Sequence, residues 1–220
     1  MNDEQRSRPA AADARTVVLV EGTSDQVALQ ALAARRGRDL AAEGVGIVPM
    51  GGARNIGRFL ELYGPRGLDL GLAGLCDARE EDDFRRGLER AGLGANLDRA
   101  EMAALGFYVC VADLEDELIR CLGPATVERL VERQGELRSF RTFQRQPAQR
   151  GRTLQQQLRR FLGTASGRKH RYARVLVDAL DLTRAPEPLD RLLAHVQAAP
   201  PAPGEGRRTP RPDRPAGSGR

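Results

Sequence analysis

The feature that most constrains the fold is a fourfold alternation of a short apolar run with an amphipathic segment. The apolar runs predict strands at residues 16–21, 44–52, 68–77 and 106–111, and the segments after them predict helices at 24–37, 54–64, 82–94 and 113–123. Strands and helices that alternate in this way are typical of a parallel sheet covered by helices on both faces. The chain is therefore predicted to fold as an α/β protein with a four-stranded parallel sheet. Ser24 is the predicted N-cap of the first helix, which Gly37 ends.

The remaining segments divide the chain further. Residues 124–198 show only helical patterns and predict a C-terminal helical extension of the core at 16–123. Residues 1–15 and 199–220 contain few large apolar side chains, and the second of these segments is rich in Pro, Gly and Arg. Both ends are expected to be disordered.

Composition limits the functional classes. A length of 220 residues suits one medium domain, and a net charge of +5 makes an anionic partner plausible. The 3 cysteines show no spacing that suggests a disulfide framework or a zinc site. The N-terminus lacks an apolar signal region, and no apolar run approaches the roughly 20 residues that cross a bilayer. A cytoplasmic protein with no membrane partner is expected.

Carboxylates gather where the predicted strands end. Glu21, Asp77, and Asp113 with Glu115 follow three of the strands, and Asp25 falls in the first helical turn after Glu21. Reactive groups of open parallel sheets lie at the carboxyl ends of the strands. Clustered carboxylates repel one another unless a cation or a proton intervenes, and oxygen-only ligands suit Mg²⁺ or Mn²⁺ rather than zinc. These five residues therefore predict a divalent-metal site.

Other interpretations of the acids stay open. An aspartate at a helix start often serves as an N-cap, which applies to Asp25 and to Asp113. The acidic run within residues 79–83 is expected to be a solvated loop and helix start, where the helix dipole favours acids. Asp116 and Glu117 are also expected to face water.

Three motifs together resemble the Toprim domain, in the version found in nucleases of the overcoming-lysogenization-defect (OLD) type. They are "VLVEGTSD", "GLCDAREEDD" and "VADLEDELIRCLG", and the resemblance extends over residues 16–195. It implies a Toprim-like, Rossmann-type sheet of four parallel strands flanked by helices. It also implies magnesium-dependent cleavage or transfer at nucleic-acid phosphodiesters.

The resemblance implies roles for individual residues. Glu21 and Asp25 match the ExxxD metal motif, with Glu21 also a candidate for proton transfer, and Asp77 matches the first acid of the DxD motif. Asp113 and Glu115 match the acidic element after the fourth strand. Lys169 resembles the lysine beside the scissile phosphate, where a cation would stabilise charge on the phosphoryl oxygens. The alternative for Lys169 is a solvated side chain on a basic helix.

The sequence departs from the family pattern in two respects. Arg79 stands where DxD has its second acid, so either Glu80, Glu81 or Asp82 substitutes, or one metal is used, or the protein is not catalytic. The chain also has no GxxxxGK[ST] motif for nucleotide phosphates. If ATP is used, a separate ATPase partner is expected to bring it.

A basic segment accompanies the acids. Residues 137–177 contain ten arginines and Lys169 but no Asp or Glu, which favours phosphate binding over a solvated helix face. The arginines nominated to bind nucleic acid are Arg138, Arg141, Arg145, Arg159, Arg168 and Arg171. Phosphate contacts position a nucleic acid without reading its bases. DNA is expected ahead of RNA, and a homodimer is considered.

The sequence thus supports a hypothesis and two rivals. The hypothesis is a Mg²⁺- or Mn²⁺-dependent endonuclease with Glu21 and Lys169 as catalytic residues. The first rival is a catalytically impaired Toprim module that binds nucleic acid as a subunit of a larger complex, which Arg79 favours. The second is a receiver-type phosphoacceptor domain. It is disfavoured because such a domain needs an acidic pair after the first strand and a lysine after the fifth.

Overall fold

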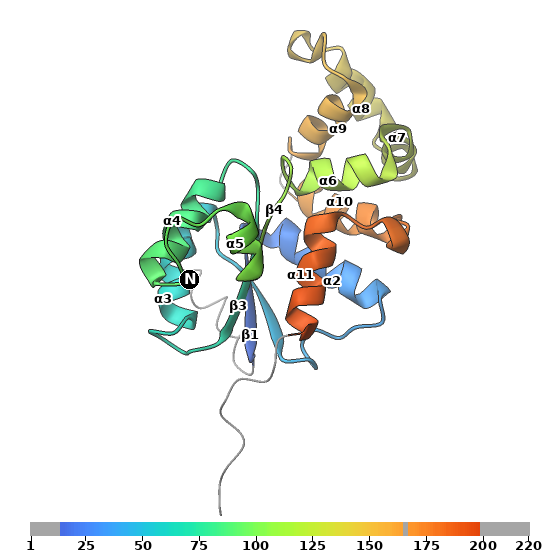
Figure 1. Ribbon diagram of the computed structural model, residues 1–220. Coiled ribbons are helices and arrows are strands. Elements are labelled where there is room, and N and C mark those ends of the chain that lie inside the picture. Colours follow the sequence, from blue (N-terminus) through green and yellow to red (C-terminus); the bar gives the residue numbers. More distant parts are fainter. Residues whose placement is uncertain (1–13, 165–166, 199–220) are drawn as a thin grey trace, which may run out of the picture.

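Four parallel strands form the centre of the protein. The computed structural model describes residues 14–164 and 167–198 (Figure 1). The strands are β1 (Thr16–Val20), β2 (Val45–Pro49), β3 (Gly71–Cys76) and β4 (Phe107–Val109), in the order β2-β1-β3-β4. All three strand pairings are parallel. The predicted α/β fold with a four-stranded parallel sheet is confirmed.

The strand sequences are apolar because both faces of the sheet are covered. Side chains alternate between the faces of a strand, so Val17 and Leu19 enter one core while Val18 and Val20 enter the other. All five residues of β1 are buried. This double burial explains why β1 reads as a continuous apolar run instead of an alternating one.

One face is covered by the helices that lie between β2 and β4 in the sequence. These are the short η1 (Ala53–Asn55), α3 (Ile56–Tyr63), α4 (Glu81–Ala91) and α5 (Arg99–Ala104). Helix α5 was not predicted from its pattern. Its start carries a capping box, in which the Asp98 side chain accepts from the Glu101 amide and the Glu101 side chain accepts from the Asp98 amide, both at 2.8 Å. The D-x-x-E spacing of these two residues is the sequence pattern that could have predicted the start of this helix.

The other face combines helices from both ends of the chain. They are α2 (Thr23–Arg35), α6 (Leu114–Leu122), α10 (Arg168–Asp178) and α11 (Glu187–Ala198), all of which contribute to one apolar core. Arg35 of α2 donates to the carbonyl oxygens of Val177 at 2.7 Å and Leu180 at 2.8 Å, at the end of α10. The C-terminal helices α10 and α11 are therefore part of the layer that closes the sheet.

The remaining helices form a lobe at the end of this layer (Figure 1). They are α7 (Pro124–Arg133), α8 (Leu137–Gln144), the short η2 (Pro147–Gln149) and α9 (Leu154–Leu162), while η3 (Leu182–Arg184) precedes α11. The rings of Phe140 and Phe143 lie 5.0 and 5.6 Å from that of Phe161 and fill the lobe. Residues 124–198 are thus helical as predicted, apart from positions 165 and 166, which lie outside the described residues. None of the described helices is both long and apolar enough for a bilayer crossing.

Several local expectations need correction. Helix α2 begins at Thr23 with Gly22 as its N-cap, so Ser24 is not the cap. Asp116 and Glu117 do not face water, since they are 9% and 2% exposed. Arg120 pairs with both, at 3.0 and 2.5 Å, and this pairing compensates their burial.

The predicted disorder of the two ends concerns mostly residues outside the described ranges, namely 1–13 and 199–220. Arg15 is an exception, because its amide donates to the Gly44 carbonyl at 2.7 Å beside the start of β1.

Candidate active site

The site lies where the strand order changes direction. The chain goes from β1 to β2 on one side and then returns to β3 on the other side of β1, so the carboxyl ends of β1 and β3 are neighbours. Val20 pairs with Leu75 near these ends, and Glu21 and Asp77 follow directly. Open parallel sheets bind ligands in the crevice at such a switch point.

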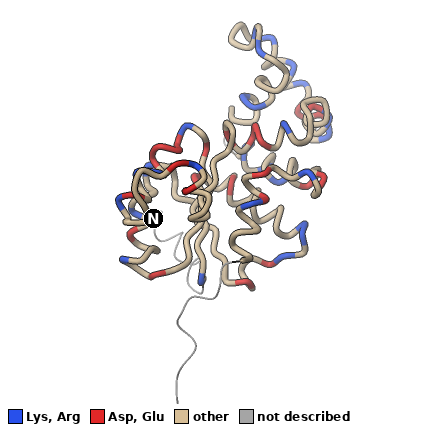
Figure 2. The backbone as a smooth tube through the Cα atoms, viewed as in Figure 1, with Lys and Arg blue, Asp and Glu red and all other residues tan. Residues whose placement is uncertain are grey.

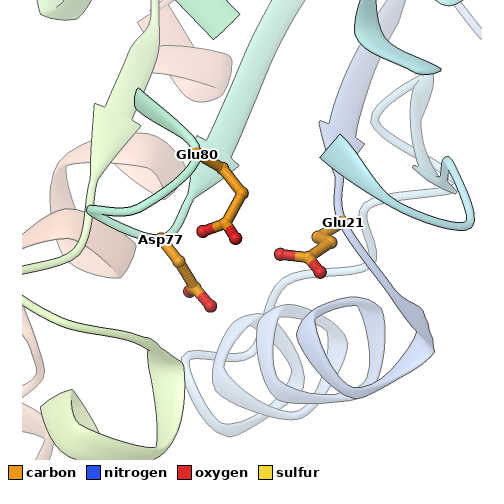
Figure 3. A group of neighbouring side chains, drawn as sticks. All are labelled: Glu21, Asp77 and Glu80. Atoms are coloured by element: carbon orange, nitrogen blue, oxygen red, sulfur yellow. The ribbon is translucent and has the colours of Figure 1, made fainter. Parts of the chain in front are cut away.

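Three carboxylates converge there. Glu21, Asp77 and Glu80 each offer an oxygen, and these oxygens lie within 4.8 Å of one another (Figure 3). Glu80 Oε2 is buried and has no hydrogen-bond partner among the described residues. An unpartnered buried carboxylate oxygen that points at two further acids fits a cation, and an all-oxygen set suits Mg²⁺ or Mn²⁺.

Among the three acids that could replace the missing one of DxD, Glu80 is the one in this cluster. The loop after β3 turns back through a bond from the Glu80 amide to the Asp77 carbonyl at 3.0 Å. Glu81 instead pairs with Arg99 at 2.6 Å, and Asp82 pairs with Arg85 at 2.8 Å. The expectation of a solvated acidic run is therefore wrong for Glu80.

A cavity of about 500 Å³ adjoins the cluster and includes more of the nominated residues. Its acidic and basic lining residues are Glu21, Asp25, Asp77, Glu115, Lys169 and His170, while Glu80 lines a neighbouring hollow that also contains Glu21. Gly51 and Gly52 line it after β2 with φ of 72° and 125°, conformations that favour glycine. The Gly52 amide donates to the Glu21 carbonyl at 3.1 Å, which fixes this turn beside the first acid.

The acids carry shifted pKa values. Burial, reinforced by Asp25 and the other nearby acids, raises the pKa of Asp77 to about 8. Burial also raises the pKa of Asp25 to about 7, against the hydrogen bond from the Gly22 amide. The pKa of Glu21 is raised by burial and then by Glu80. The uncomplexed cluster therefore retains protons that a bound cation would displace.

Lys169 lies at the rim of the acids although it comes from the C-terminal part of the chain. Its Nζ is 3.2 Å from Glu115 Oε1. Partial burial alone would lower the pKa of Lys169, but Glu115 and the neighbouring acids outweigh it and raise the pKa. The first turn of α10 is held against α2 by the contact of His170 Nδ1 with Thr23 Oγ1 at 3.0 Å.

Asp113 is the N-cap of α6, as the sequence allowed, whereas Asp25 is not an N-cap but lies at the third position of α2, after the N-cap Gly22. Asp113 accepts from the Asp116 amide at 2.8 Å and pairs with Arg159 at 2.6 Å. Asp25 accepts from the Gly22 amide at 2.8 Å and still lines the cavity. Asp113 does not line this cavity, so its assignment as a metal ligand stays a prediction.

Most of the nominated arginines are already paired within the protein. Arg141 pairs with Glu128 at 2.7 Å, and Arg159 with Asp113 as described. Arg168 and Arg171 both pair with Glu136, at 3.1 and 2.6 Å. Glu136 directly precedes the basic segment at residues 137–177 and neutralises part of its positive charge. A count of charged residues within 137–177 could not reveal these pairs, because the acidic partners lie outside that segment.

Two nominated arginines remain without such pairs. Arg138 and Arg145 make no side-chain ion pair with the residues that the structure describes. Arg138 lines a shallow hollow between α8 and α9 with Arg168. Figure 2 shows basic residues and no acidic ones along α8 and α9.

Residues 14–78 match the family described as "Overcoming lysogenization defect protein-like, TOPRIM domain". The resemblance to OLD-like Toprim domains is confirmed. The match includes Glu21, Asp25 and Asp77 of the site. No curated protein matched the chain.

Solved structures extend the likeness to the helical part. The C-terminal region of the Burkholderia pseudomallei OLD protein is 19% identical with a TM-score of 0.64, covering 84% of this chain and 97% of that one. The C-terminal region of the Xanthomonas campestris pv. campestris OLD protein is 23% identical with a TM-score of 0.62, covering 84% and 95%. At these identities the likeness shows that the chain shares its fold with these two C-terminal regions.

Proposed function

We propose that this OLD-like Toprim protein is a metal-dependent nuclease that cleaves phosphodiester bonds of nucleic acid. The observation that supports this most is the convergence of Glu21, Asp77 and Glu80 beside a cavity that Glu21 and Asp77 line together with Lys169. Phosphodiester cleavage needs cationic groups around the phosphate, and a site of this composition supplies them in the form of a metal ion and an ammonium group.

The proposed ligands are the three converging carboxylates. Mg²⁺ or Mn²⁺ would be held by Glu21, Asp77 and Glu80, with Asp25 and Glu115 at the border of the same cavity. A bound ion of this kind polarises a phosphoryl oxygen and lowers the pKa of water. Glu115 pairs with Lys169 and Asp113 with Arg159, so this arrangement favours one ion over two.

The side chains of the protein have separate proposed roles. Lys169 stabilises the charge that builds on the phosphoryl oxygens, and Glu115 holds its ammonium group toward the cavity. Glu21, which lies in the cluster and lines the cavity, takes up a proton from the attacking water. His170 holds the first turn of α10, and with it Lys169, through its contact with Thr23.

Plasmid cleavage tests this function. Purified protein is incubated with supercoiled DNA and, separately, with a structured RNA, in MgCl₂, MnCl₂ or EDTA. The proposal predicts metal-dependent cleavage that Glu21→Ala abolishes and that Asp82→Asn, in an exposed ion pair, leaves intact. Absence of cleavage of both substrates in both metals, with the protein folded, would refute it.

A second candidate is a nucleic-acid-binding subunit without activity. The observation that favours it is the internal pairing of Asp113 and Glu115 with cations, together with Arg79 in the acidic loop. Wild-type protein that binds the same DNA or RNA but never cleaves it would support this candidate. An ATPase partner in a separate chain, a homodimer and a cytoplasmic location remain predictions.

A further inference from the structure

Arg79 is an exposed cation in the loop that carries the acid cluster. It lies between Asp77 and Glu80 in the sequence and makes no hydrogen bond or ion pair with the described residues. Its side chain borders two hollows of similar size. One, of about 490 Å³, also contains Glu21, Glu80 and Arg54, and the other, of about 480 Å³, lies toward α9.

The hollow toward α9 is basic. Arg152 and Arg160 line it with Arg79, and neither has a carboxylate partner among residues 14–164 and 167–198. The Arg152 guanidinium donates to the Ala148 carbonyl at 2.9 Å, which leaves its charge uncompensated. Arg159 lines the same hollow but is neutralised by Asp113. Three uncompensated guanidinium groups thus face one volume.

This hollow is continuous with the acid cavity. Glu115, Gly163, Thr164 and Lys169 line both. A chain of phosphates could therefore extend from the acids past Lys169 to the arginines without leaving the surface. Guanidinium groups bind phosphate through paired N–H donors, and uncompensated ones gain most from an anion.

We infer that Arg79, Arg152 and Arg160 bind the backbone phosphate next to the one presented to the acid cluster. The inference rests on the proposed function and deepens it. Arg79, which stands at the position of the second acid of DxD, then binds substrate instead of a metal ion. It contacts the sugar-phosphate backbone, so the contact does not depend on the base sequence. These three arginines lack an internal acid partner among the described residues, and none of them belongs to the set nominated from the sequence.

Binding without hydrolysis tests this inference. Fluorescence anisotropy in EDTA measures the affinity for labelled single-stranded and duplex DNA and for the same sequences as RNA. Arg79→Ala and Arg160→Ala are each expected to weaken binding about 3- to 10-fold. Each should also make the dependence of the logarithm of the association constant on the logarithm of the salt concentration less steep, by about 0.7–0.9 for each phosphate that is no longer neutralised. Arg79→Lys should keep the slope.

Arg90→Ala is the matched control. It removes one exposed arginine from the last turn of α4, at the opposite end of that helix from the acidic loop. Its affinity and salt slope should equal those of the wild type. Thermal unfolding midpoints should be unchanged in Arg79→Ala, since the side chain makes no hydrogen bond or ion pair with the described residues.

Wild-type affinity and slope in Arg79→Ala, or no binding of any of the four oligonucleotides by the wild type, would overturn the inference. Failure of the proposed function gives a different result. Absence of cleavage with metal, together with the expected weaker binding in Arg79→Ala, would refute the nuclease and leave this phosphate contact in place.

Discussion

At the scale of single residues, Glu80 and Glu81 show how one position changes the role of an acid. Both lie where α4 begins, but Glu80 is turned toward Asp77 while Glu81 pairs with Arg99 on the surface. One step along a helix rotates the side chain by roughly 100°, because a turn takes about 3.6 residues. This rotation separates an acid of the converging cluster from an acid in a surface ion pair.

Lys169 provides a prediction at this scale. Lys169→Ala should lower the cleavage rate about 10²- to 10³-fold, because the variant lacks a cation at the phosphoryl oxygens. Lys169→Arg should restore part of the rate. Arg174→Ala is the control, since it removes a cation from the same helix that is paired with Asp178 at 2.8 Å. Equal single-turnover rates for Lys169→Ala and the control would contradict the assigned role.

The raised pKa values of Asp25 and Asp77 predict that the stability of the folded protein depends on pH. Their pKa values of about 7 and about 8 in the folded protein exceed the ordinary value of 3.8 that applies on unfolding. Between pH 4 and 8 the folded state therefore binds more protons than the unfolded state, and its stability falls as pH rises through this window. A bound cation should offset the effect.

The expected result is a thermal unfolding midpoint that decreases from pH 6 to pH 9 in EDTA. The increase caused by MgCl₂ should be larger at pH 8.5 than at pH 6, because protons compete with the ion. Asp77→Asn should reduce both trends. An identical MgCl₂ effect at the two pH values would contradict the predicted competition.

At the scale of elements, α10 connects the core to the site. Leu176 is buried in the apolar core that α10 shares with α2, α6 and α11. In the first turn of the same helix, Lys169 pairs with Glu115 and His170 contacts Thr23. Weaker packing along this helix should therefore affect both stability and the position of Lys169.

Leu176→Ala should reduce the free energy of unfolding by about 2–5 kcal/mol, as is typical for a cavity in a packed core. Val175→Ala, at a partly buried position next to it, should cost clearly less. Urea denaturation at constant pH measures both. Equal, small reductions in the two variants would show that α10 is not anchored through this face.

The sheet and its helices could be predicted from periodicity, because doubly buried strands are apolar throughout and the amphipathic helices between them are regular. The short α5 was missed since six residues show little periodicity, although its D-x-x-E capping box was readable. Glu80 could be named only as one of three alternatives, because its direction depends on the turn after β3. Internal pairing of Arg168 and Arg171 with Glu136 depends on tertiary contacts and could not be read from a charge count.

At the scale of the whole molecule, the site is assembled from distant parts of the chain. Glu21 follows the first strand, and Asp77 and Glu80 follow the third (Figure 3). Lys169 lies in α10, near the end of the described chain. The helices α10 and α11 complete the layer that covers the sheet together with α2 and α6, and α10 also carries Lys169. Packing of α10 against the sheet layer therefore also places Lys169 beside the acids.

The central claim is that Glu21, Asp77 and Glu80 share one divalent cation. Electron paramagnetic resonance of free Mn²⁺ during a titration at pH 8 measures it directly. The wild type is expected to have one tight site, and Glu80→Gln an affinity at least about tenfold weaker. Asp82→Asn should keep the wild-type affinity, because Asp82 pairs with Arg85 outside the cluster. Unchanged Mn²⁺ affinity in Glu80→Gln would contradict the central claim.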